Sequence, residues 1–481
     1  MPPPGFFDAL AFEAGLAARA IGDAASGLFE PKVRLGVTGL SRAGKTVFIT
    51  ALVHALTAGG RFPVLTAMAE GRVSGAHLAP QPDDNVPRFA YETHLEAFLG
   101  ADRHWPDSTR AIAELRLVID YESKGGWRGG PRKLTLDLVD YPGEWLLDLP
   151  LLKLDYATWA RQTLAACRTP QRLKHSHLFL EAAQAALHAP ADEIEAQRVA
   201  YLFRDALLAM RDDPSIIARL APGHFLMQGA REGAPALTFA PLPVEGEIKR
   251  GSLAAMMARR YDAYRDHVVK PFFRDHFARL DRQIVLVDVL HALNAGPDAV
   301  ADLRVALDDI LGAFRTGADS FWTDWIRPKI DRVLFAATKA DHLNPMSHDR
   351  LEAILRLIVE RSLRRIGDSG ARIDVIALAS VRATREAEVR ELNSVLPAIA
   401  GVPLKGEVIG DVTFDGVAEA VIFPGELPAK PEQAIDTGFP RGSLRFVRFR
   451  PPLIAADDRS FPLPHIRLDR ALEFLIGDRL P

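Results

Sequence analysis

The stretch KVRLGVTGLSRAGKTVFITALVHALTAGG, residues 32–60, decides the fold class of this chain. KVRLGVTGL is an apolar, β-rich run, and VFITALVHALT has apolar positions that fit a helix stopped by Gly59 and Gly60. Between them, GLSRAGKT at residues 39–46 matches the complete G-x-x-x-x-G-K-[ST] pattern. A strand, a glycine-rich loop and a helix in this order predict the opening of an α/β domain that binds phosphates.

The chemistry of phosphate binding explains each residue type in this loop. Glycines allow successive backbone N–H groups to turn towards phosphates, and the following helix N-terminus favours an anion. We expect Lys45 to reach the β- and γ-phosphate oxygens and the Thr46 hydroxyl to bind Mg²⁺. The expected contacts of the loop are Gly39, Ser41, Arg42, Ala43, Gly44, Lys45, Thr46 and Val47.

Further along the chain, DYPG at residues 140–143 stands at the end of the second of two β-rich runs. ELRLVIDYE and KLTLDLVDY are separated by the glycine-rich SKGGWRGGPR, which predicts an antiparallel hairpin. At the end of the second run, Asp140 would hold Mg²⁺ through water, and the Gly143 N–H would bond the γ-phosphate. Asp137 is the weaker candidate because it lies further from the end of the strand.

Two later strand ends carry residues suited to a guanine base. TKAD, residues 338–341, follows the run RVLFAA, and the Asp341 carboxylate could accept from guanine N1–H and the exocyclic amine. Thr338 and Lys339 complete this motif, and the lysine stem would cover the base. Adenine lacks that pair of donors. ALAS ends the next strand, where a backbone N–H of Ala379 or Ser380 would meet guanine O6.

GLSRAGKT, DYPG, TKAD and ALAS in this order resemble the motifs of the Ras-like GTPase domain. The hairpin before DYPG resembles the antiparallel pair of that fold, and the resemblance covers about half the chain. The form of the phosphate loop, the helical stretch after DYPG and the C-terminal strands and helix are similar to the YcjX-like family of bacterial P-loop proteins. That resemblance implies a cytoplasmic, stress-associated nucleotide switch.

The expected fold is α/β, with a mixed, mostly parallel sheet that contains one antiparallel hairpin. The sequence changes from a β-rich to a helical pattern after DYPG, and the β-rich pattern returns near residue 281. These two changes set the expected domain boundaries. Prolines predict an irregular connection over residues 61–110. In chain order we expect an amphipathic helix over 1–30, a Ras-like G domain over 31–144 and 281–395, a helical insertion over 145–280, and C-terminal short strands and a helix over 396–481.

Hydrolysis needs residues beyond the phosphate loop. A switch threonine must lie before the hairpin, and Thr109 is the expected ligand of Mg²⁺ and the γ-phosphate, with Thr93 and Ser108 as alternatives. Glu144 stands where many small GTPases have a glutamine that orients the attacking water. A carboxylate repels the γ-phosphate and cannot donate to it, so we expect slow turnover. Candidates for an internal charge-stabilising arginine are Arg42, Arg103 and Arg110.

Composition narrows the class of protein. The 481 residues include Lys+Arg 59 and Asp+Glu 62, a formal net charge of −3, which does not favour nucleic-acid binding. A single cysteine, Cys167, excludes an intramolecular disulfide and a cysteine-cluster metal site. No apolar run reaches the ~18 residues of a spanning helix, and residues 1–30 lack the basic region of an export signal. We expect a cytoplasmic protein, with peripheral contact at the inner face of the membrane as an alternative.

The expected function is binding of GTP and GDP with Mg²⁺ and slow hydrolysis of GTP. The helical insertion or the switch regions would present a nucleotide-dependent surface to a protein partner. Two alternatives remain open, an ATPase or kinase, and a nucleotide-gated scaffold without significant hydrolysis. TKAD argues against the first, whereas Glu144 keeps the second open.

Overall fold

A computed structural model describes most of the chain. The described residues are 30–39, 42–60, 62–81, 83–106, 111–124, 129–213, 216, 220–226, 234–312, 330–367, 370–391, 394–436, 444–454 and 463–481. Two expected site residues, Ser41 and Thr109, lie outside these ranges, as does the helix expected over residues 1–30 except for its last residue. Within the described ranges, no helix is both long enough and apolar enough to cross a bilayer.

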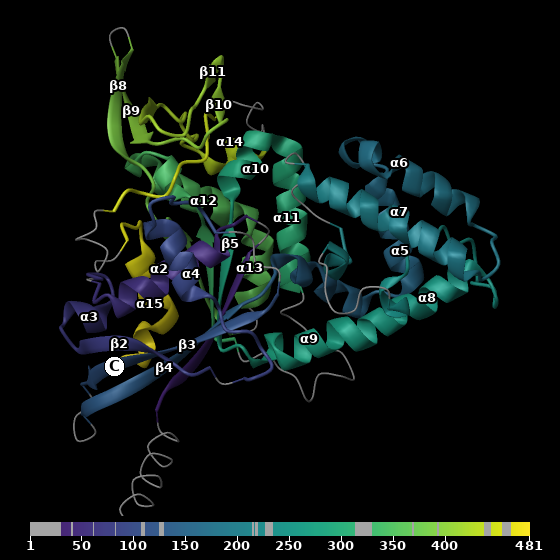
Figure 1. Cartoon of the computed structure of the whole chain (residues 1–481), viewed down its shortest axis with the longest axis horizontal. Coiled ribbons are helices and arrows are strands. Elements are labelled where there is room, and N and C mark those ends of the chain that lie inside the picture. Colours follow the sequence, from purple (N-terminus) through teal and green to yellow (C-terminus); the bar gives the residue numbers. More distant parts are fainter. Residues whose placement is uncertain are drawn as a thin grey trace, which may run out of the picture.

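The described residues form a central seven-stranded sheet in the order β2-β3-β4-β1-β5-β6-β7 (Figure 1). Its strands are β1 (Lys32–Gly39), β2 (Val73–Ala79), β3 (Ala113–Ser123), β4 (Gly130–Asp140), β5 (Arg282–Val287), β6 (Arg332–Ala337) and β7 (Arg372–Ala377). β1 and β4 to β7 run parallel, and β3 pairs antiparallel with β4. The predicted mixed, mostly parallel α/β fold is therefore confirmed.

The expectation of an irregular connection over residues 61–110 is wrong. This stretch contains α3 (Thr66–Ala69), β2 and α4 (Tyr91–Leu99), and β2 adds a second antiparallel pairing, with β3. β2 lies at the edge of the sheet, and its residues are half-buried or exposed. VSGAHLA therefore lacks the alternation of apolar and polar residues by which a half-buried strand is recognised in a sequence.

Helices cover both faces of the sheet because successive strand residues point to opposite sides. One face packs against α2 (Lys45–Thr57) and α15 (Leu468–Ile476), and the other packs against the helices that follow β5 and β6. Those helices are α10 (Val289–Ala295), α11 (Pro297–Gly312), α12 (His348–Ile358) and α13 (Glu360–Gly367). Short 3-10 turns lie over Ala340–His342, Pro345–Ser347 and Gly477–Arg479.

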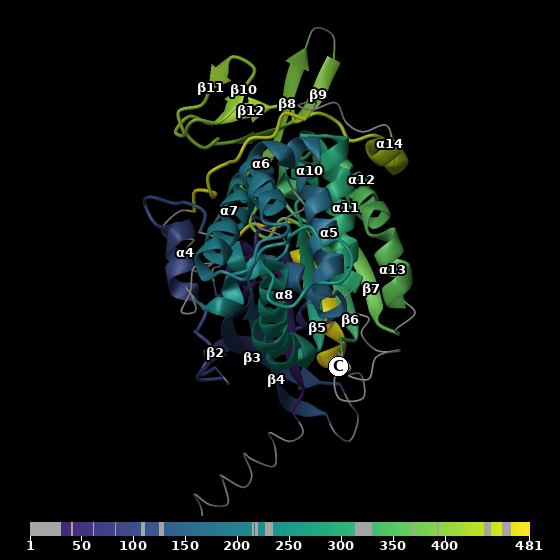
Figure 2. The same ribbon diagram turned by 90° about the vertical axis from the view of Figure 1, so that its right-hand side faces the viewer.

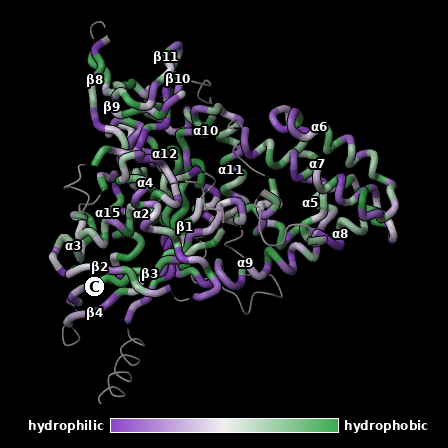
Figure 3. The backbone as a smooth tube through the Cα atoms, viewed as in Figure 1, coloured by the Kyte–Doolittle hydropathy of each residue, from purple (hydrophilic) through white to green (hydrophobic). Residues whose placement is uncertain are grey.

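The chain between β4 and β5 is helical. Its elements are η2 (Gly143–Lys153), α5 (Tyr156–Cys167), α6 (Pro170–Ala185), α7 (Glu193–Asp212), η3 (Gly223–Leu226), η4 (Pro235–Leu237), α8 (Leu253–Tyr264), η5 (Arg265–Val269), α9 (Lys270–Asp275) and η6 (Phe277–Arg279). Helices α5 to α8 project to one side of the sheet, at the right in Figure 1 and towards the viewer in Figure 2. Hydrophobic and hydrophilic residues alternate along them (Figure 3).

This helical region, residues 145–280, has a hydrophobic core of its own. Trp159 lies at its centre and stacks on Tyr261, with 4.9 Å between the ring centroids. Arg172 at the start of α6 forms an ion pair of 2.8 Å with Asp302 of α11. A second apolar cluster joins this region to the sheet, since Tyr141 at the end of β4 packs with Phe272 and Phe277.

The C-terminal stretch is divided between two places. β8 (Arg385–Glu391), β9 (Ser394–Gly401) and β12 (Ala420–Ile422) form a small sheet, with β10 (Val408–Ile409), β11 (Val412–Thr413) and α14 (Pro431–Asp436) nearby (Figure 1). β9 crosses the boundary expected between residues 395 and 396. The run SLRFVRFRPP forms no strand among its described residues, although Phe449 bridges to Pro403.

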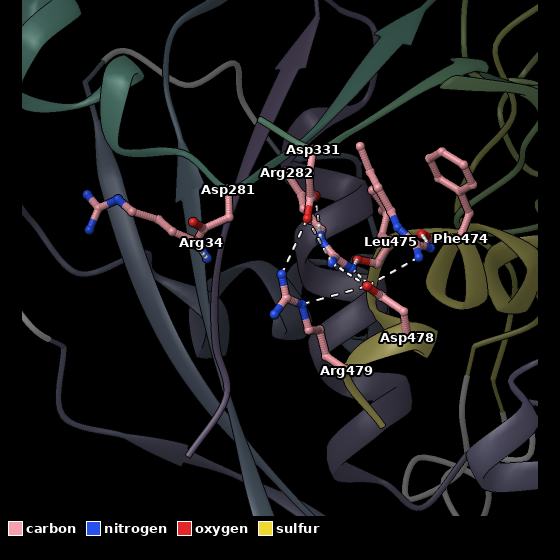
Figure 4. A network of polar contacts seen from close by, with 9 residues as sticks. Arg34, Asp281, Arg282, Asp331, Phe474, Leu475, Asp478 and Arg479 are labelled. Atoms are coloured by element: carbon pink, nitrogen blue, oxygen red, sulfur yellow. Dashed lines mark hydrogen bonds and ion pairs between the residues drawn. The ribbon is translucent and has the colours of Figure 1, made fainter. Parts of the chain in front are cut away.

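α15, the final helix predicted from LDRALEFLIGDRL, belongs to the main core rather than to the small sheet. Arg282 of β5, which is fully buried, fixes the end of α15 (Figure 4). Its guanidinium pairs with Asp478 at 2.5 Å and with Asp331 at 3.1 Å, and it also donates to the Leu475 carbonyl. Two carboxylates and a carbonyl surround this buried charge, so its burial is compensated.

Candidate functional site

The two glycines of the loop between β1 and α2 have the conformation or the close packing that the motif predicts. Gly44 has φ +91°, and Gly39 lies so close to β5 that a Cβ there would stand 2.6 Å from the Leu286 carbonyl oxygen. Arg42 also adopts a left-handed conformation, with φ 64°. Lys45 is buried, and its Nζ donates to the Gly39 carbonyl at 3.1 Å. The lysine side chain therefore lies across its own loop.

Thr46 and Asp140 lie near the carboxyl ends of the neighbouring strands β1 and β4. Thr46 is in the first turn of α2, and the parallel register of β1 and β4 places Val37 beside Asp140. Asp140 is 1% exposed. A hydroxyl and a carboxylate suit Mg²⁺, which prefers oxygen ligands and keeps several waters. Among the described residues, no group of three or more His, Cys, Asp and Glu side chains is placed to bind a metal by itself.

Asp137, the weaker metal candidate, is held by cations. Arg116 of β3 donates to both of its oxygens, at 2.6 and 2.9 Å, and Lys32 of β1 lies 3.0 Å away. Burial tends to raise the pKa of Asp137, but Arg116 and Lys32 outweigh it, so the pKa is lowered. This pairing gives Asp137 a role in holding neighbouring strands together.

The segment after Asp140 turns directly into the helical region. Tyr141 is fully buried, its hydroxyl accepts from Gln283 Nε2 at 3.2 Å, and its ring meets Phe272 edge-on. Gly143 begins η2, and the next residue, Glu144, is 8% exposed. The two residues expected to meet the γ-phosphate and the attacking water thus stand at the junction of the sheet and the helical region.

TKAD follows β6 as predicted, and its residues form hydrogen bonds with neighbouring segments. The Thr338 N–H donates to the Val287 carbonyl at 2.9 Å, and Lys339 has φ 61°. Asp341, which is 5% exposed, accepts from the Ala383 N–H at 2.9 Å. The loops after β6 and β7 are therefore joined through the carboxylate that is expected to recognise the base.

The structure changes one expectation for ALAS. The Ala379 N–H donates to the Ile466 carbonyl at 3.1 Å, so this amide is already used in the backbone. Ser380 is the neighbouring residue, and it is also buried. Of the two amides expected to meet guanine O6, that of Ser380 is therefore the better candidate. Ile466 lies far away in the chain, so the sequence gives no signal of this contact.

Sequence reasoning also missed Asp288, which directly follows β5. Its side chain accepts a hydrogen bond of 3.1 Å from the His291 N–H and thereby caps the N-terminus of α10. The same carboxylate forms an ion pair with Lys339. Burial tends to raise the pKa of Asp288, but the combined effect of Lys339 and His291 outweighs burial, so the pKa is lowered and the carboxylate stays ionised. A lone aspartate after a strand belongs to no motif, so only the fold reveals its contact with TKAD.

A cavity of about 390 Å³ lies beside the phosphate loop. Arg42, Asp288 and Lys339 line it on the side of the central sheet. Arg211 of α7 and Phe446 of the C-terminal stretch line it from outside that sheet. The helical region and the C-terminal stretch thus both reach the surroundings of the expected nucleotide site.

The sheet order, the phosphate loop after β1, the hairpin that ends in DYPG and the TKAD loop after β6 define a Ras-like P-loop fold. The chain belongs to the YcjX-like family (DUF463), whose profile matches residues 33–480. The family resemblance drawn from the motifs is therefore confirmed.

Two curated relatives cover nearly the whole chain. A protein of Escherichia coli K12 named Ras-like GTPase YcjX is 39% identical over an alignment of 464 positions that covers 93% of this chain and 96% of that protein. A protein of the same name from Shewanella oneidensis MR-1 is 34% identical over an alignment of 482 positions that covers 93% of this chain and 94% of that protein. Two bacterial proteins named Ras-like GTPases are therefore similar to this chain over nearly its full length.

Proposed function

We propose that this chain binds GTP and GDP with Mg²⁺, hydrolyses GTP slowly and acts as a nucleotide-dependent switch. The observation that carries the proposal is the buried Asp341 carboxylate, held by Ala383 beside the loop after β7. Names of the two curated relatives, both Ras-like GTPases, support a GTPase of the same kind.

In this proposal the phosphate loop holds the charged end of the nucleotide. Lys45 and the loop amides bind the β- and γ-phosphates, and the Gly143 N–H bonds the γ-phosphate. Thr46 and Asp140 supply the oxygen donors for Mg²⁺, and Thr109 remains the predicted switch ligand. Bound Mg²⁺ would neutralise negative charge on the phosphate oxygens.

The base end of the site relies on three residues. Asp341 accepts from guanine N1–H and the exocyclic amine, Lys339 covers the base with its stem, and the Ser380 amide meets O6. Adenine offers no such pair of donors, so the Asp341 oxygen that is expected to face the base would receive no hydrogen bond from it. This argues against the alternative of an ATPase or kinase.

Slow turnover follows from Glu144. Its carboxylate accepts a hydrogen bond from water but repels the γ-phosphate, and burial strengthens that repulsion. Among the arginine candidates, Arg103 is engaged elsewhere, since its Nε donates to the Pro451 carbonyl at 2.8 Å, whereas Arg42 is exposed and lines the cavity. Arg110 lies outside the described residues. A scaffold without significant hydrolysis is the second candidate, and Glu144 is the observation that favours it.

The cellular setting is proposed from the family resemblance and the composition. We place the protein in the cytoplasm in a stress-associated role, with residues 1–30 as the segment for any peripheral contact with the inner face of the membrane. Residues 145–280 are the proposed helical insertion, which would carry the surface for a protein partner. No specific nucleic-acid partner is expected, because the net charge is −3.

Calorimetric titration of the full chain with GTP, GDP and ATP in excess Mg²⁺ tests the proposal. GTP and GDP should bind, with ATP weaker by about 100-fold or more, since a site that hydrogen-bonds one base rejects a base that lacks the donors. Phosphate release from GTP, measured in the same preparation, separates the slow GTPase from the scaffold. Equal or tighter ATP binding would contradict guanine recognition.

A further inference from the structure

A buried carboxylate joins η2, at the start of the helical region, to later parts of that region. Asp148 lies in η2 and is fully buried. It accepts from the Tyr264 hydroxyl at 2.5 Å and from the backbone N–H groups of Gly223 and His224 at 2.7 and 3.3 Å. The His224 Nδ1 also lies 2.5 Å from it. Every one of these partners lies in η3 or at the end of α8, in later parts of the helical region.

Packing reinforces these hydrogen bonds one turn earlier. Trp145 stacks on His224 with 4.2 Å between ring centroids and an interplanar angle of 19°. Gly223 lies against the backbone of Glu144, where a Cβ on residue 223 would stand only 1.8 Å from the Glu144 carbonyl oxygen. η3 therefore lies directly against Glu144, an expected catalytic residue.

Loss of even one hydrogen bond to the buried Asp148 carboxylate is unfavourable. A buried charge is tolerated only while its hydrogen-bond partners remain in place, because each lost donor exposes the carboxylate to an apolar surrounding. Burial and the neighbouring Asp148 raise the pKa of Tyr264 well above its ordinary value, so its hydroxyl stays protonated and donates. The segment Gly143–Lys153 is therefore held to η3 and to the end of α8 through Asp148.

We propose that Asp148 is a positioning residue for hydrolysis: through Tyr264, Gly223 and His224 it fixes the segment that carries Glu144 against η3 and α8 of the helical region. The inference rests on the proposed function, because it assigns Asp148 to the same reaction. It predicts that a weaker contact at Asp148 reduces the rate of the chemical step and leaves GDP affinity unchanged, since Asp148 itself touches neither the phosphate loop nor TKAD.

Tyr264→Phe tests the proposal, because it removes one donor to Asp148 and keeps the ring that packs against Phe225 and Phe239. Tyr156→Phe is the matched control. Tyr156 is another buried tyrosine of the same core, but its hydroxyl donates to the Ala240 carbonyl and accepts from the Leu242 N–H, both within the helical region. Both variants lose one buried hydroxyl, and only Tyr264→Phe changes the hold on Asp148.

We expect kcat for GTP to fall about 10- to 100-fold in Tyr264→Phe, because small displacements of catalytic groups have effects of that size. Its Kd for GDP should stay within about twofold of wild type, and Tyr156→Phe should keep both values. Amide exchange over residues 143–149 should rise in Tyr264→Phe alone. Gly223→Ala, which must displace the Glu144 backbone, should lower kcat in the same way.

The outcomes separate this inference from the proposed function. A wild-type chain that does not hydrolyse GTP refutes the enzyme, and amide exchange over residues 143–149 then still tests the role of Asp148 as the anchor of this segment. Equal kcat and equal exchange in Tyr264→Phe and Tyr156→Phe would overturn the inference, as would a loss of GDP affinity as large as the loss of kcat.

Discussion

Replacing Asp341 by asparagine should change the base that this protein prefers. In the structure one carboxylate oxygen, Oδ2, accepts from the Ala383 N–H at 2.9 Å. An asparagine has a single oxygen, and the Ala383 amide would bind it. The side-chain NH₂ of Asp341→Asn would then point to the place where the base is expected, and it could donate to the carbonyl that xanthine has in place of the guanine amine.

The expected magnitude follows from the burial of this side chain, which is 5% exposed. A hydrogen bond to a charged group contributes about 1.5–3 kcal/mol, which corresponds to roughly 10- to 150-fold in affinity. In Asp341→Asn the guanine amine would lose its acceptor and face a donor. GDP affinity should therefore fall about 100-fold or more, and XDP should bind more tightly than GDP. Stability should change by about 1 kcal/mol or less, since the Ala383 contact is kept.

Calorimetry with GDP, XDP and ADP on the wild type and on Asp341→Asn measures this change directly. Asp349→Asn is a suitable control, because that carboxylate is largely exposed and pairs with Arg467 at 2.5 Å. The control should keep the wild-type order of the three nucleotides. A folded Asp341→Asn protein that still prefers GDP would refute the assignment of TKAD to base recognition.

Three further predictions concern phosphate binding, pH and local stability. Lys45→Ala should lose measurable GTP affinity in a folded protein, as seen by calorimetry with circular dichroism as the folding check, because the loop offers no second buried ammonium; unchanged affinity would exclude the phosphate-loop assignment. Asp137 has a lowered pKa and so stabilises the fold above the unfolded carboxyl pKa of about 4, losing that effect as pH falls through its folded pKa. Asp137→Asn should thus lower the unfolding free energy by about 1–3 kcal/mol at pH 7 and much less at pH 3 in urea titrations, whereas a pH-independent difference would contradict the pairing with Arg116. Burial raises the pKa of Cys167 from 9.0 to about 11, so its alkylation by iodoacetamide at pH 8 should be about 100-fold slower than that of the unfolded chain, and a fast reaction would mean that α5 opens readily.

The sequence predicts well those parts of the fold that depend on local pattern. The strand, loop and helix at residues 32–57 are formed by neighbouring residues, and a complete phosphate-loop motif leaves few alternative structures. DYPG and TKAD were placed correctly at strand ends, because apolar strands that stop at a motif are visible without any tertiary contact.

Contacts between residues far apart in the chain could not be predicted. The Ala379 amide is used by Ile466, Asp288 meets Lys339, and Asp148 meets Tyr264 only because separate segments fold against one another. β2 was missed for a related reason, since it is held at a sheet edge by pairing with β3 rather than by its own pattern. Such contacts depend on packing, which periodicity does not encode.

The position of α15 has a consequence for how the protein is made. About 400 residues separate the end of α2 from the start of α15, although both helices pack in one core. At ~5–20 residues per second, the ribosome needs about 20–80 s to add that stretch. During this time the core that β1 and α2 begin lacks the side chains of α15, so the last folding step of this core should follow synthesis of Leu468–Ile476.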